Sequence, residues 1–445
     1  DIVDASQTSA RGAASLAEVG RTLSTWPQLA GDVTLGGATV AAAVRRLGLG
    51  EPLPSGRVRV DLDVLVGTVA PPPAYREAWP DPPPEPCRPD TDDPLVVVAH
   101  AASLAPSGGN AQPWRFTAGG DRFSIELDRG RTSAMDVRSR GSLVAIGAAL
   151  FNARAAAAAV GRLGPVALFP GGPHSDAVAT MTLGRDGDPE LAAMYPDVLR
   201  RAANRRRGTH EPLDPAVAGR LVAAAAAEGG GLRLITGEDQ MAACAEILGA
   251  SERVRFLTER LHREMIGELR WPGDDLSTGI DVRTLELGPS DEAALRVVRR
   301  GDVMELLEDW DAGSALGENA RGAVRSSSAL AVVTVPSASP LGYVHGGSAV
   351  ERVWVTAQQA GLGVQPVSPV FVFAVQDADF ATLGGDRWAD ELRALAGRFR
   401  AAVELAPADA VALVLRLSHV GPPSVRSQRL PLDQVLVVEE QPAGA

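Results

Sequence analysis

Two helix-forming segments of equal length, far apart in the chain, constrain the fold more than any other feature. GAALFNARAAAAAVG runs from Gly147 to Gly161, and GSAVERVWVTAQQAG runs from Gly347 to Gly361. Both are apolar around most of their circumference, which is typical of central helices buried on several sides. A glycine at each carboxyl end suits the left-handed conformation that ends many helices. The pair predicts two halves related by an approximate twofold, as in a dimer folded into one chain. Chance similarity between Ala-rich helices is the alternative, and the repeat alone leaves it open.

Strand-like runs follow each of these segments after a loop. They are AVATMTL at Ala177–Leu183 and VALVLRL at Val411–Leu417. Further strands are expected at Leu330–Val335 and Val370–Val375, and a short helix at Val96–Leu104. This mixture predicts an α+β fold in which mixed or antiparallel sheets surround the central helices.

The first part of the chain is expected to form a separate, small α/β unit. Residues 1–67 predict a helix around 14–23, a helix around 35–48 and an alternating strand at 57–66. A Pro-rich stretch at residues 68–93 follows, and its proline density predicts a stiff, extended linker without a packed core.

The remaining chain divides into two predicted halves, residues 94–200 and residues 201–445. The second half contains a polar, acidic segment at about 267–326 with short helical stretches and no long apolar face. Long segments with a weak core signal often serve as lids, although a plain surface insertion is the alternative.

Charge and composition exclude several classes of function. The 445 residues carry a net charge of −12, so the chain lacks the basic footprint that nucleic-acid binding requires. Cys87 and Cys244 give no disulfide framework and are expected to be reduced thiols. The six histidines show no metal-ligand spacing, so no metal site is predicted. No apolar run or leader indicates a membrane span or a signal peptide, and we expect a cytoplasmic protein. The chain opens at Asp1, so we expect a piece of a longer polypeptide.

APSGGNAQPWRF, from Ala105 to Phe116, is the most specific chemical signal. Its Ser-Gly-Gly-Asn run offers a hydroxyl, an amide and bare backbone N–H groups in a turn that can approach a ligand closely. Donors and acceptors presented together suit the polar edge of a planar heterocycle. An ordinary turn before a strand would explain Ser-Gly-Gly alone, but the full string makes that less probable.

Three further segments carry candidate binding groups. NRRRGTHEPLDPAV holds an arginine triplet suited to bidentate phosphate contact, although such a triplet is more often a solvated basic face. GLGVQPVSP, from Gly361 to Pro369, leaves exposed backbone N–H groups of the kind a flavin needs near its reactive N5. GPPSVRSQRLPLDQVLV adds Arg426 and Arg429, which would close on the same phosphate or form a charged tail.

These strings resemble, in family order, the nitroreductase-like family of FMN proteins. The matching pieces are APSGGNAQPWRF, RRRGTHEPLDPAV, ERVWVTAQQAGLGVQP and RLSHVGPPSVRSQRLPL, and the resemblance covers about residues 94–440. The doubled layout is similar to an actinobacterial branch in which one chain folds as two nitroreductase halves, with a lid segment over the flavin. Because each matching string occurs once, one FMN is expected.

The resemblance also implies roles for individual residues. Arg206 and Arg207 would hold the FMN phosphate and the pyrimidine edge of the ring, and Arg429 would meet the phosphate. The other half would line the ring with Ser107, Gly108, Asn110 and Gln112. Near N5 would lie Gln365, Pro366 and Val367. Gly208 and His210 depart from the family's Arg-Arg-Ser/Thr-x-Arg pattern, which weakens the phosphate assignment. The predicted cofactor-binding residues are Arg206, Arg207, Ser107, Gly108, Asn110, Gln112, Gln365, Pro366, Val367, Arg426 and Arg429.

Residues 1–67 resemble the C-terminal end of a ThiF-like adenylating domain, through STWPQLAGDVTLGGATVAAAVRRLGLG and LPSGRVRVDLD. The nucleotide-binding part of that family lies upstream of such a segment, so this block alone should not adenylate anything. The resemblance implies an upstream adenylating domain of the same polypeptide and similarity to molybdopterin-biosynthesis-like fusion proteins.

Three functions follow as hypotheses. The first is an FMN-dependent oxidoreductase that takes hydride from NAD(P)H and reduces a small-molecule electron acceptor such as a nitroaromatic or a quinone; no protein side chain is assigned as catalytic, because the cofactor carries the chemistry. The second is a protein that binds or sequesters FMN under a closed lid without turnover. The third is a non-catalytic partner module of an adenylating fusion protein.

Overall fold

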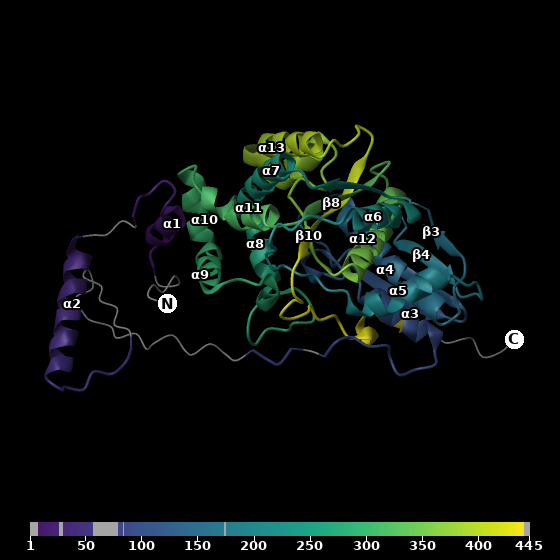
Figure 1. Cartoon of the computed structure of the whole chain (residues 1–445), viewed down its shortest axis with the longest axis horizontal. Helices are drawn as coiled ribbons and strands as arrows, with labels where there is room; N and C mark the ends of the chain where they lie inside the picture. The colour runs from purple at the N-terminus through teal and green to yellow at the C-terminus, as the bar shows by residue number, and fades with distance from the viewer. Residues whose placement is uncertain (1–7, 26–29, 57–78, 83, 173–174, 440–445) are drawn as a thin grey trace.

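The structure is a computed structural model that describes residues 8–25, 30–56, 79–82, 84–172 and 175–439. It is 50% helical and 15% strand, which confirms the predicted α+β class. Figure 1 shows the elements. The α-helices are α1 Ala10–Glu18, α2 Ala30–Gly48, α3 Pro94–Ser103, α4 Arg140–Ala159, α5 Pro189–Arg200, α6 Pro215–Ala227, α7 Glu238–Leu257, α8 Glu259–Glu268, α9 Pro289–Val298, α10 Gly301–Asp309, α11 Glu318–Arg325, α12 Pro340–Gln359 and α13 Asp377–Ala402.

The strands and short 3₁₀ turns complete the described elements. The strands are β1 Trp114–Gly119, β2 Arg122–Leu127, β3 Val166–Leu168, β4 Ala177–Thr182, β5 Gly231–Ile235, β6 Leu269–Arg270, β7 Ile280–Asp281, β8 Ala329–Val335, β9 Leu362–Val367, β10 Ala410–His419 and β11 Leu436–Val438. The 3₁₀ turns are η1 Gly108–Asn110, η2 Val137–Ser139, η3 Val282–Leu285, η4 Ser314–Gly317 and η5 Leu432–Gln434.

Two larger sheets share one topology. The first has the order β11-β1-β2-β4-β3, and the second has the order β5-β8-β10-β9. The four strands β1-β2-β4-β3 of the first sheet correspond in order to β5-β8-β10-β9 of the second, so that in each case the last two strands are exchanged relative to the sequence. Every neighbouring pair among these strands is antiparallel. A long helix separates the second strand from the third in both cases, α4 in the first and α12 in the second. The C-terminal β11 adds to the first sheet, parallel to β1.

The helices α4 and α12 form the centre of the molecule. Seventeen of the 20 residues of α4 are buried, which explains why its sequence is apolar on all sides. The two helices touch through Gly147 and Gly347, where a Cβ atom on either glycine would lie 2.0 Å from a carbonyl oxygen of the other helix. Each helix ends as predicted at a glycine with positive φ, +67° at Gly161 and +77° at Gly361.

The predicted starts of these two helices are wrong. Both helices begin before the glycines that open the repeated strings, at Arg140 and Pro340. Gly147 and Gly347 therefore lie inside the helices, and their missing side chains serve the close contact between backbones. Val137–Ala159 is long and apolar enough to cross a membrane by length and composition, but 89% of its apolar window is buried, as in the core helix of a globular protein.

The strand predicted at Val370–Val375 is also wrong. Backbone hydrogen bonds from Val372 to Pro369 (2.9 Å) and from Ala374 to Phe371 (3.0 Å) fold this apolar run into turns. The strand precedes it as β9 at the edge of the second sheet, where a proline is tolerated because its outer side needs no donor. The predicted strands at Ala177–Leu183, Leu330–Val335 and Val411–Leu417 are confirmed within a few residues as β4, β8 and β10.

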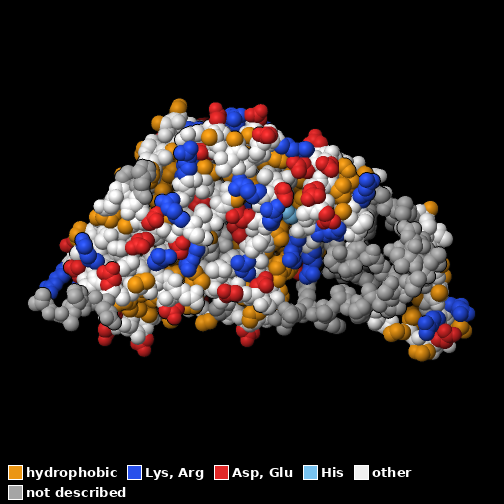
Figure 2. Space-filling view, turned by 180° about the vertical axis from the view of Figure 1, so that it is seen from behind, with side chains coloured by type: hydrophobic (Ala, Val, Ile, Leu, Met, Phe, Trp, Pro, Cys, Tyr) orange, Lys and Arg blue, Asp and Glu red, His pale blue; other side chains and the backbone are white. Residues whose placement is uncertain are grey.

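In the N-terminal block, the predicted helix at 14–23 starts earlier and is shorter, as α1, because the Ser9 side chain accepts from the Gly12 N–H at 3.2 Å and caps its start. The helix predicted at 35–48 is α2, which lies apart from the body in Figure 1. The strand predicted at 57–66 lies outside the described residues. In Figure 2, acidic and basic side chains are interspersed over most of the visible face of the body.

Candidate functional site

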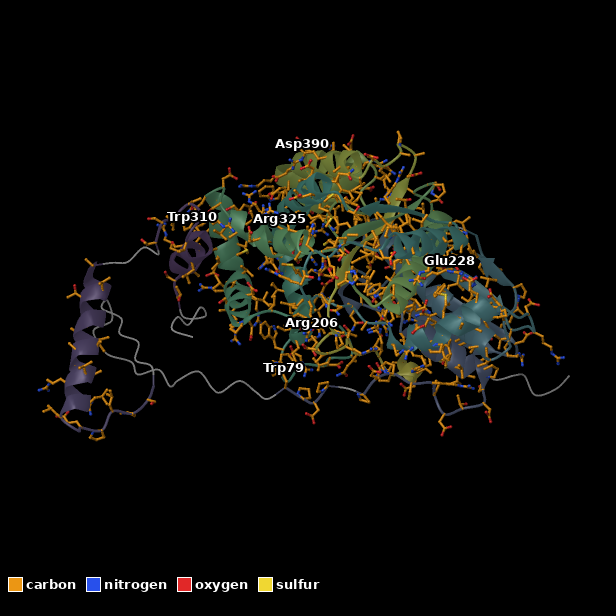
Figure 3. The ribbon with its side chains drawn as sticks, in the orientation of Figure 1. Trp79, Arg206, Glu228, Trp310, Arg325 and Asp390 are labelled. Atoms are coloured by element: carbon orange, nitrogen blue, oxygen red, sulfur yellow. The ribbon has the colours of Figure 1, made fainter. Side chains whose placement is uncertain are left out.

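A cavity of about 1490 Å³ lies between the Ser107–Asn110 turn, the arginine triplet and the segment predicted as a lid. Ten of the eleven predicted cofactor-binding residues line it; the exception is Gln112. Asn110 and Arg206, from strings widely separated in the sequence, therefore share one cavity. Figure 3 labels Arg206 on the lower side of the body, above the segment that carries Trp79.

The turn that follows α3 is held in a conformation that few residues adopt. Gly109, Asn110 and Gln112 have φ of 57°, 54° and 54°. Asn tolerates this region because its short amide bonds locally. The Ser107 hydroxyl accepts from the Gln112 N–H at 2.9 Å and closes the turn. Ser107, Gly108 and Asn110 line the cavity from this turn, and the Asn110 amide also donates to the Gln428 carbonyl at 3.0 Å.

Gln112 connects this turn to two other segments of the chain. Its side chain is fully buried and donates to the Ser277 carbonyl at 2.8 Å, while its carbonyl oxygen accepts from the Leu430 N–H at 2.9 Å. These bonds join the turn to the lid segment and to the C-terminal segment. Gln112 thus connects the turn to both segments, and it is absent from the cavity lining.

The arginine triplet spreads its side chains toward the lid segment. Arg205 donates to the Thr284 carbonyl and hydroxyl at 3.1 and 3.0 Å, and burial lowers its pKa to about 10. Arg206 lies 3.5 Å from the Glu286 carboxylate, and Arg207 donates to the Asn319 side chain at 2.8 Å. The sequence prediction missed Arg205, which also lines the cavity.

The departures from the family pattern have a local cause. A Cβ atom on Gly208 would stand 2.8 Å from the Ser326 carbonyl and 2.9 Å from the Ser418 Cβ, so a hydroxyl residue does not fit there without a shift. The His210 Nδ1 lies 3.0 Å from the Ser327 carbonyl, and His210 does not line the cavity. Neither position therefore adds a cation to the cavity wall.

Arg416 of β10 is a further cation that lines the cavity, and sequence reasoning missed it. It is 1% exposed, and its Nε donates to the Gln365 side chain at 2.8 Å while Nη2 donates to the Arg206 carbonyl at 2.8 Å. Burial, and then Arg207 and Arg205, lower its pKa to about 10. Among the described residues no carboxylate forms an ion pair with it. A charged residue inside the apolar strand AVALVLRLSH was the signal that could have revealed it.

The two C-terminal arginines are engaged by protein groups. Arg429 donates to the Leu104 and Ala105 carbonyls at 3.2 and 3.0 Å and to the Asn110 side chain at 3.0 Å. Burial lowers its pKa to about 9. Arg426 pairs with Glu85 at 3.3 Å. Arg429 thus fixes the turn from the cavity wall, while Arg426 holds the Pro-rich stretch.

A buried ion pair lies beneath the turn. The carboxylate of Glu351, on α12, is fully buried and lies 2.8 Å from the Arg201 guanidinium, which also donates to the Leu104 carbonyl at 2.8 Å. Arg201 stacks over the Trp354 ring at 4.6 Å. Burial raises the pKa of Glu351, and the Arg201 charge opposes this shift. This cluster connects the central helix to the carbonyl at the end of α3.

The segment predicted as a lid contributes residues to the cavity lining. They come from α9, η4, α11 and the chain between Leu269 and Gly288. The described part of the Pro-rich stretch crosses the same region: Trp79 stacks with Arg283 at 4.5 Å, the Pro80 carbonyl accepts from Arg283 at 2.8 Å, and Pro86 lines the cavity. Side chains of this stretch therefore contact the body at several points.

No family model matches the chain. It is similar to the uncharacterised protein MT1398 of Mycobacterium tuberculosis, with 46% identity over 437 residues that cover 96% of this chain and 60% of that protein. The chain thus spans 60% of the length of this curated relative.

Two solved structures have limited similarity to the chain. A nitroreductase-like family protein from Bacillus cereus has a TM-score of 0.30 and 13% identity, covering 56% of this chain and 96% of that one. The NADPH:FMN oxidoreductase from Vibrio harveyi has a TM-score of 0.31 and 11% identity, covering 57% and 79%.

Proposed function

We propose that the chain binds one FMN in the cavity and is an NAD(P)H-dependent oxidoreductase of the nitroreductase type. The observation that carries the proposal is that the Ser107–Asn110 turn and the arginines Arg205–Arg207 and Arg416 line the same cavity. FMN requires two kinds of protein group: polar groups that bind the edge of its ring, and cations that bind its phosphate.

The donor set fits the phosphate. Arg205, Arg206, Arg207 and Arg416 all line the cavity, and the Glu286 carboxylate lies 3.5 Å from Arg206. Arg416 and Arg205 are held away from water, so an anion there is attracted more strongly than at an exposed site. We therefore assign phosphate contact to Arg206 and Arg207, with Arg205 and Arg416 supplying further positive charge.

The remaining contacts follow the family resemblance. Ser107, Gly108 and Asn110 would line the ring, and Gln365, Pro366 and Val367 would lie near N5. FMN, when bound, accepts and donates a hydride at N5. The protein's part is to place the ring, to donate hydrogen bonds to it and to exclude bulk water beneath the lid segment. Arg429 keeps Asn110 in position through the bond between their side chains.

We also propose that the chain is a pseudo-dimer of two nitroreductase-like halves. The shared strand order of the two sheets and the reciprocal contact of Gly147 with Gly347 support it. The matching sequence strings occur once each, which supports a single FMN.

FMN sequestration without turnover is the second candidate. The lid segment and Pro86 contribute to the cavity lining, and this cover favours restricted access. A non-catalytic module of an adenylating fusion protein is the third candidate; it rests on the ThiF-like resemblance of residues 1–67, an upstream adenylating domain and a link to molybdopterin biosynthesis. It predicts a colourless protein that gains no flavin spectrum when FMN is added.

An absorption spectrum of the pure protein, with and without added FMN, tests the proposal first. Bound flavin is expected, and a protein that binds none contradicts both flavin functions. Steady-state oxidation of NADH and NADPH with a quinone or a nitroarene then separates the first two. Turnover supports the oxidoreductase, whereas bound FMN without turnover supports sequestration.

A further inference from the structure

The helices α1, α7, α8 and α9 contribute a group of apolar side chains to the cavity lining. They include Leu16, Ala17, Phe256, Met265, Leu295 and Val298. None of these residues belongs to the predicted cofactor-binding set. We call this part of the cavity the apolar compartment.

Helix α1 is a built-in wall of this compartment. Ala13 and Ala14 are fully buried against the body, and Glu18 is 2% exposed. The Glu18 carboxylate accepts from the Gly313 N–H at 2.8 Å and from the Thr22 hydroxyl at 2.8 Å, and Arg21 pairs with Glu318 at 2.8 Å. A helix fixed by buried contacts and by charge presents the side chains that face the cavity in a defined position.

The size of the cavity leaves room for a second molecule. Cavities that hold one small ligand measure about 300–1,000 Å³, and this one measures about 1490 Å³. Apolar walls favour an apolar guest because burying its surface removes it from water. Glu268 lies at the side of the cavity where the turn begins, since a Cβ atom on Gly109 would be 2.5 Å from its carboxylate. The Glu268 carboxylate lies 3.6 Å from Arg255, which also lines the cavity, so this pair presents little net charge to a guest.

We infer that the apolar compartment binds a bulky, uncharged, apolar electron acceptor, and that Leu16 and Ala17 of α1 determine how large that acceptor can be. This inference rests on the proposed function for its redox partner. It assigns to the N-terminal helix a part in substrate selection. The net reaction is NADPH plus a proton plus a quinone, giving NADP⁺ and a hydroquinone, so two electrons and two protons are balanced.

Ala17→Trp tests the inference by filling the compartment. The probes are 1,4-benzoquinone and the same ring with a decyl chain, which differ only in apolar bulk. We expect the KM for the decyl quinone to rise at least about tenfold, the range that hydrophobic pockets achieve, with the KM for benzoquinone unchanged. Leu16→Ala, which removes contacts without adding bulk, should raise the decyl quinone KM several-fold.

Arg11→Trp is the matched control, because Arg11 lies on the same helix, is exposed and does not line the cavity. It should leave both KM values unchanged, and circular dichroism should show all three variants folded. Equal KM changes for the two quinones in both cavity variants would overturn the inference.

Equilibrium dialysis of the decyl quinone against the same proteins gives a readout that needs no turnover. One outcome is that the protein contains no flavin, binds the decyl quinone, and binds it more weakly as Ala17→Trp. This outcome would support the compartment and refute the proposed function. Bound FMN and benzoquinone turnover, with decyl quinone binding unaffected by Ala17→Trp, would refute the compartment alone.

Discussion

Gly147 of α4 and Gly347 of α12 face each other where the two central helices cross. A Cβ atom on Gly347 would stand 2.9 Å from the Gly147 Cα and 2.0 Å from the Val144 carbonyl oxygen, and one on Gly147 would stand 2.0 Å from the Val344 carbonyl oxygen. The helices are thus in backbone contact, and the neighbouring Val144 and Ala148 line the cavity. The site depends on this crossing.

Gly147→Ala should destabilise the protein although alanine favours a helix. The propensity gain is about 1 kcal/mol, but a methyl group against backbone atoms separates the helices, and such overpacking costs about 1–3 kcal/mol or more. Gly219→Ala in α6 is the control, because a Cβ atom there meets nothing within 4 Å, and it should be neutral or stabilising. Urea denaturation of both variants measures the difference; equal stabilities would contradict a close crossing.

Arg416→Gln should weaken FMN binding. The substitution removes a buried guanidinium next to the arginine triplet, and charge-assisted contacts of this type contribute roughly 1.5–3 kcal/mol, so the Kd should rise at least about tenfold. Fluorescence titration with FMN and with riboflavin shows whether the lost affinity belongs to the phosphate. The Kd for FMN should rise, and the Kd for riboflavin, which has no phosphate, should stay the same. Arg115→Gln changes a side chain that is 56% exposed and should have no effect. A uniform loss for both ligands would indicate a structural defect.

Glu351 and Arg201 should be strongly coupled in stability. Removing either charge leaves the other buried without its partner, which costs about 3–5 kcal/mol, whereas replacing both with apolar residues is often close to neutral. We expect Glu351→Leu and Arg201→Met each to destabilise, and the double variant to be more stable than the sum of the singles predicts. Chemical denaturation of the unmodified protein, the two single variants and the double variant measures this coupling as a double-mutant cycle. Additive effects would show that the pair is not coupled.

Asp379 should make stability dependent on acid pH. Burial opposes its ionisation, but hydrogen bonds from Arg140 at 2.7 Å and from the Val375 and Gln376 N–H groups outweigh burial and hold its pKa well below the usual range. Its contribution, about 2–3 kcal/mol for bonds to a charged group, is therefore present above the unfolded pKa of about 4 and is lost as the pH falls below it.

Asp379→Asn should remove most of this acid dependence and lower stability at pH 7. Asp377→Asn changes a side chain that is 86% exposed, and its profile should follow the unmodified protein. Thermal unfolding between pH 7 and pH 3 measures both. An Asp379→Asn profile as steep as that of the unmodified protein would assign the acid sensitivity to other groups.

The elements that depend on local chemistry were readable from the amino-acid sequence. The apolar circumference of α4 and α12 predicted buried central helices, and Gly161 and Gly361 predicted their ends, because only a residue without Cβ adopts a left-handed cap without strain. The polar composition of the Ser107–Asn110 turn likewise marked it as a candidate binding element before any fold was known.

Tertiary structure decided what depends on contacts between distant segments. It placed Gly147 and Gly347 at a helix crossing, folded the strand-like run after Pro369 into turns, and joined Gln112 to the lid segment and the C-terminal segment. It also brought Arg416 to the arginine triplet and α1 to the cavity wall. Local sequence does not encode such placements, because the free energy that selects them comes from packing and from burial of charge across hundreds of residues.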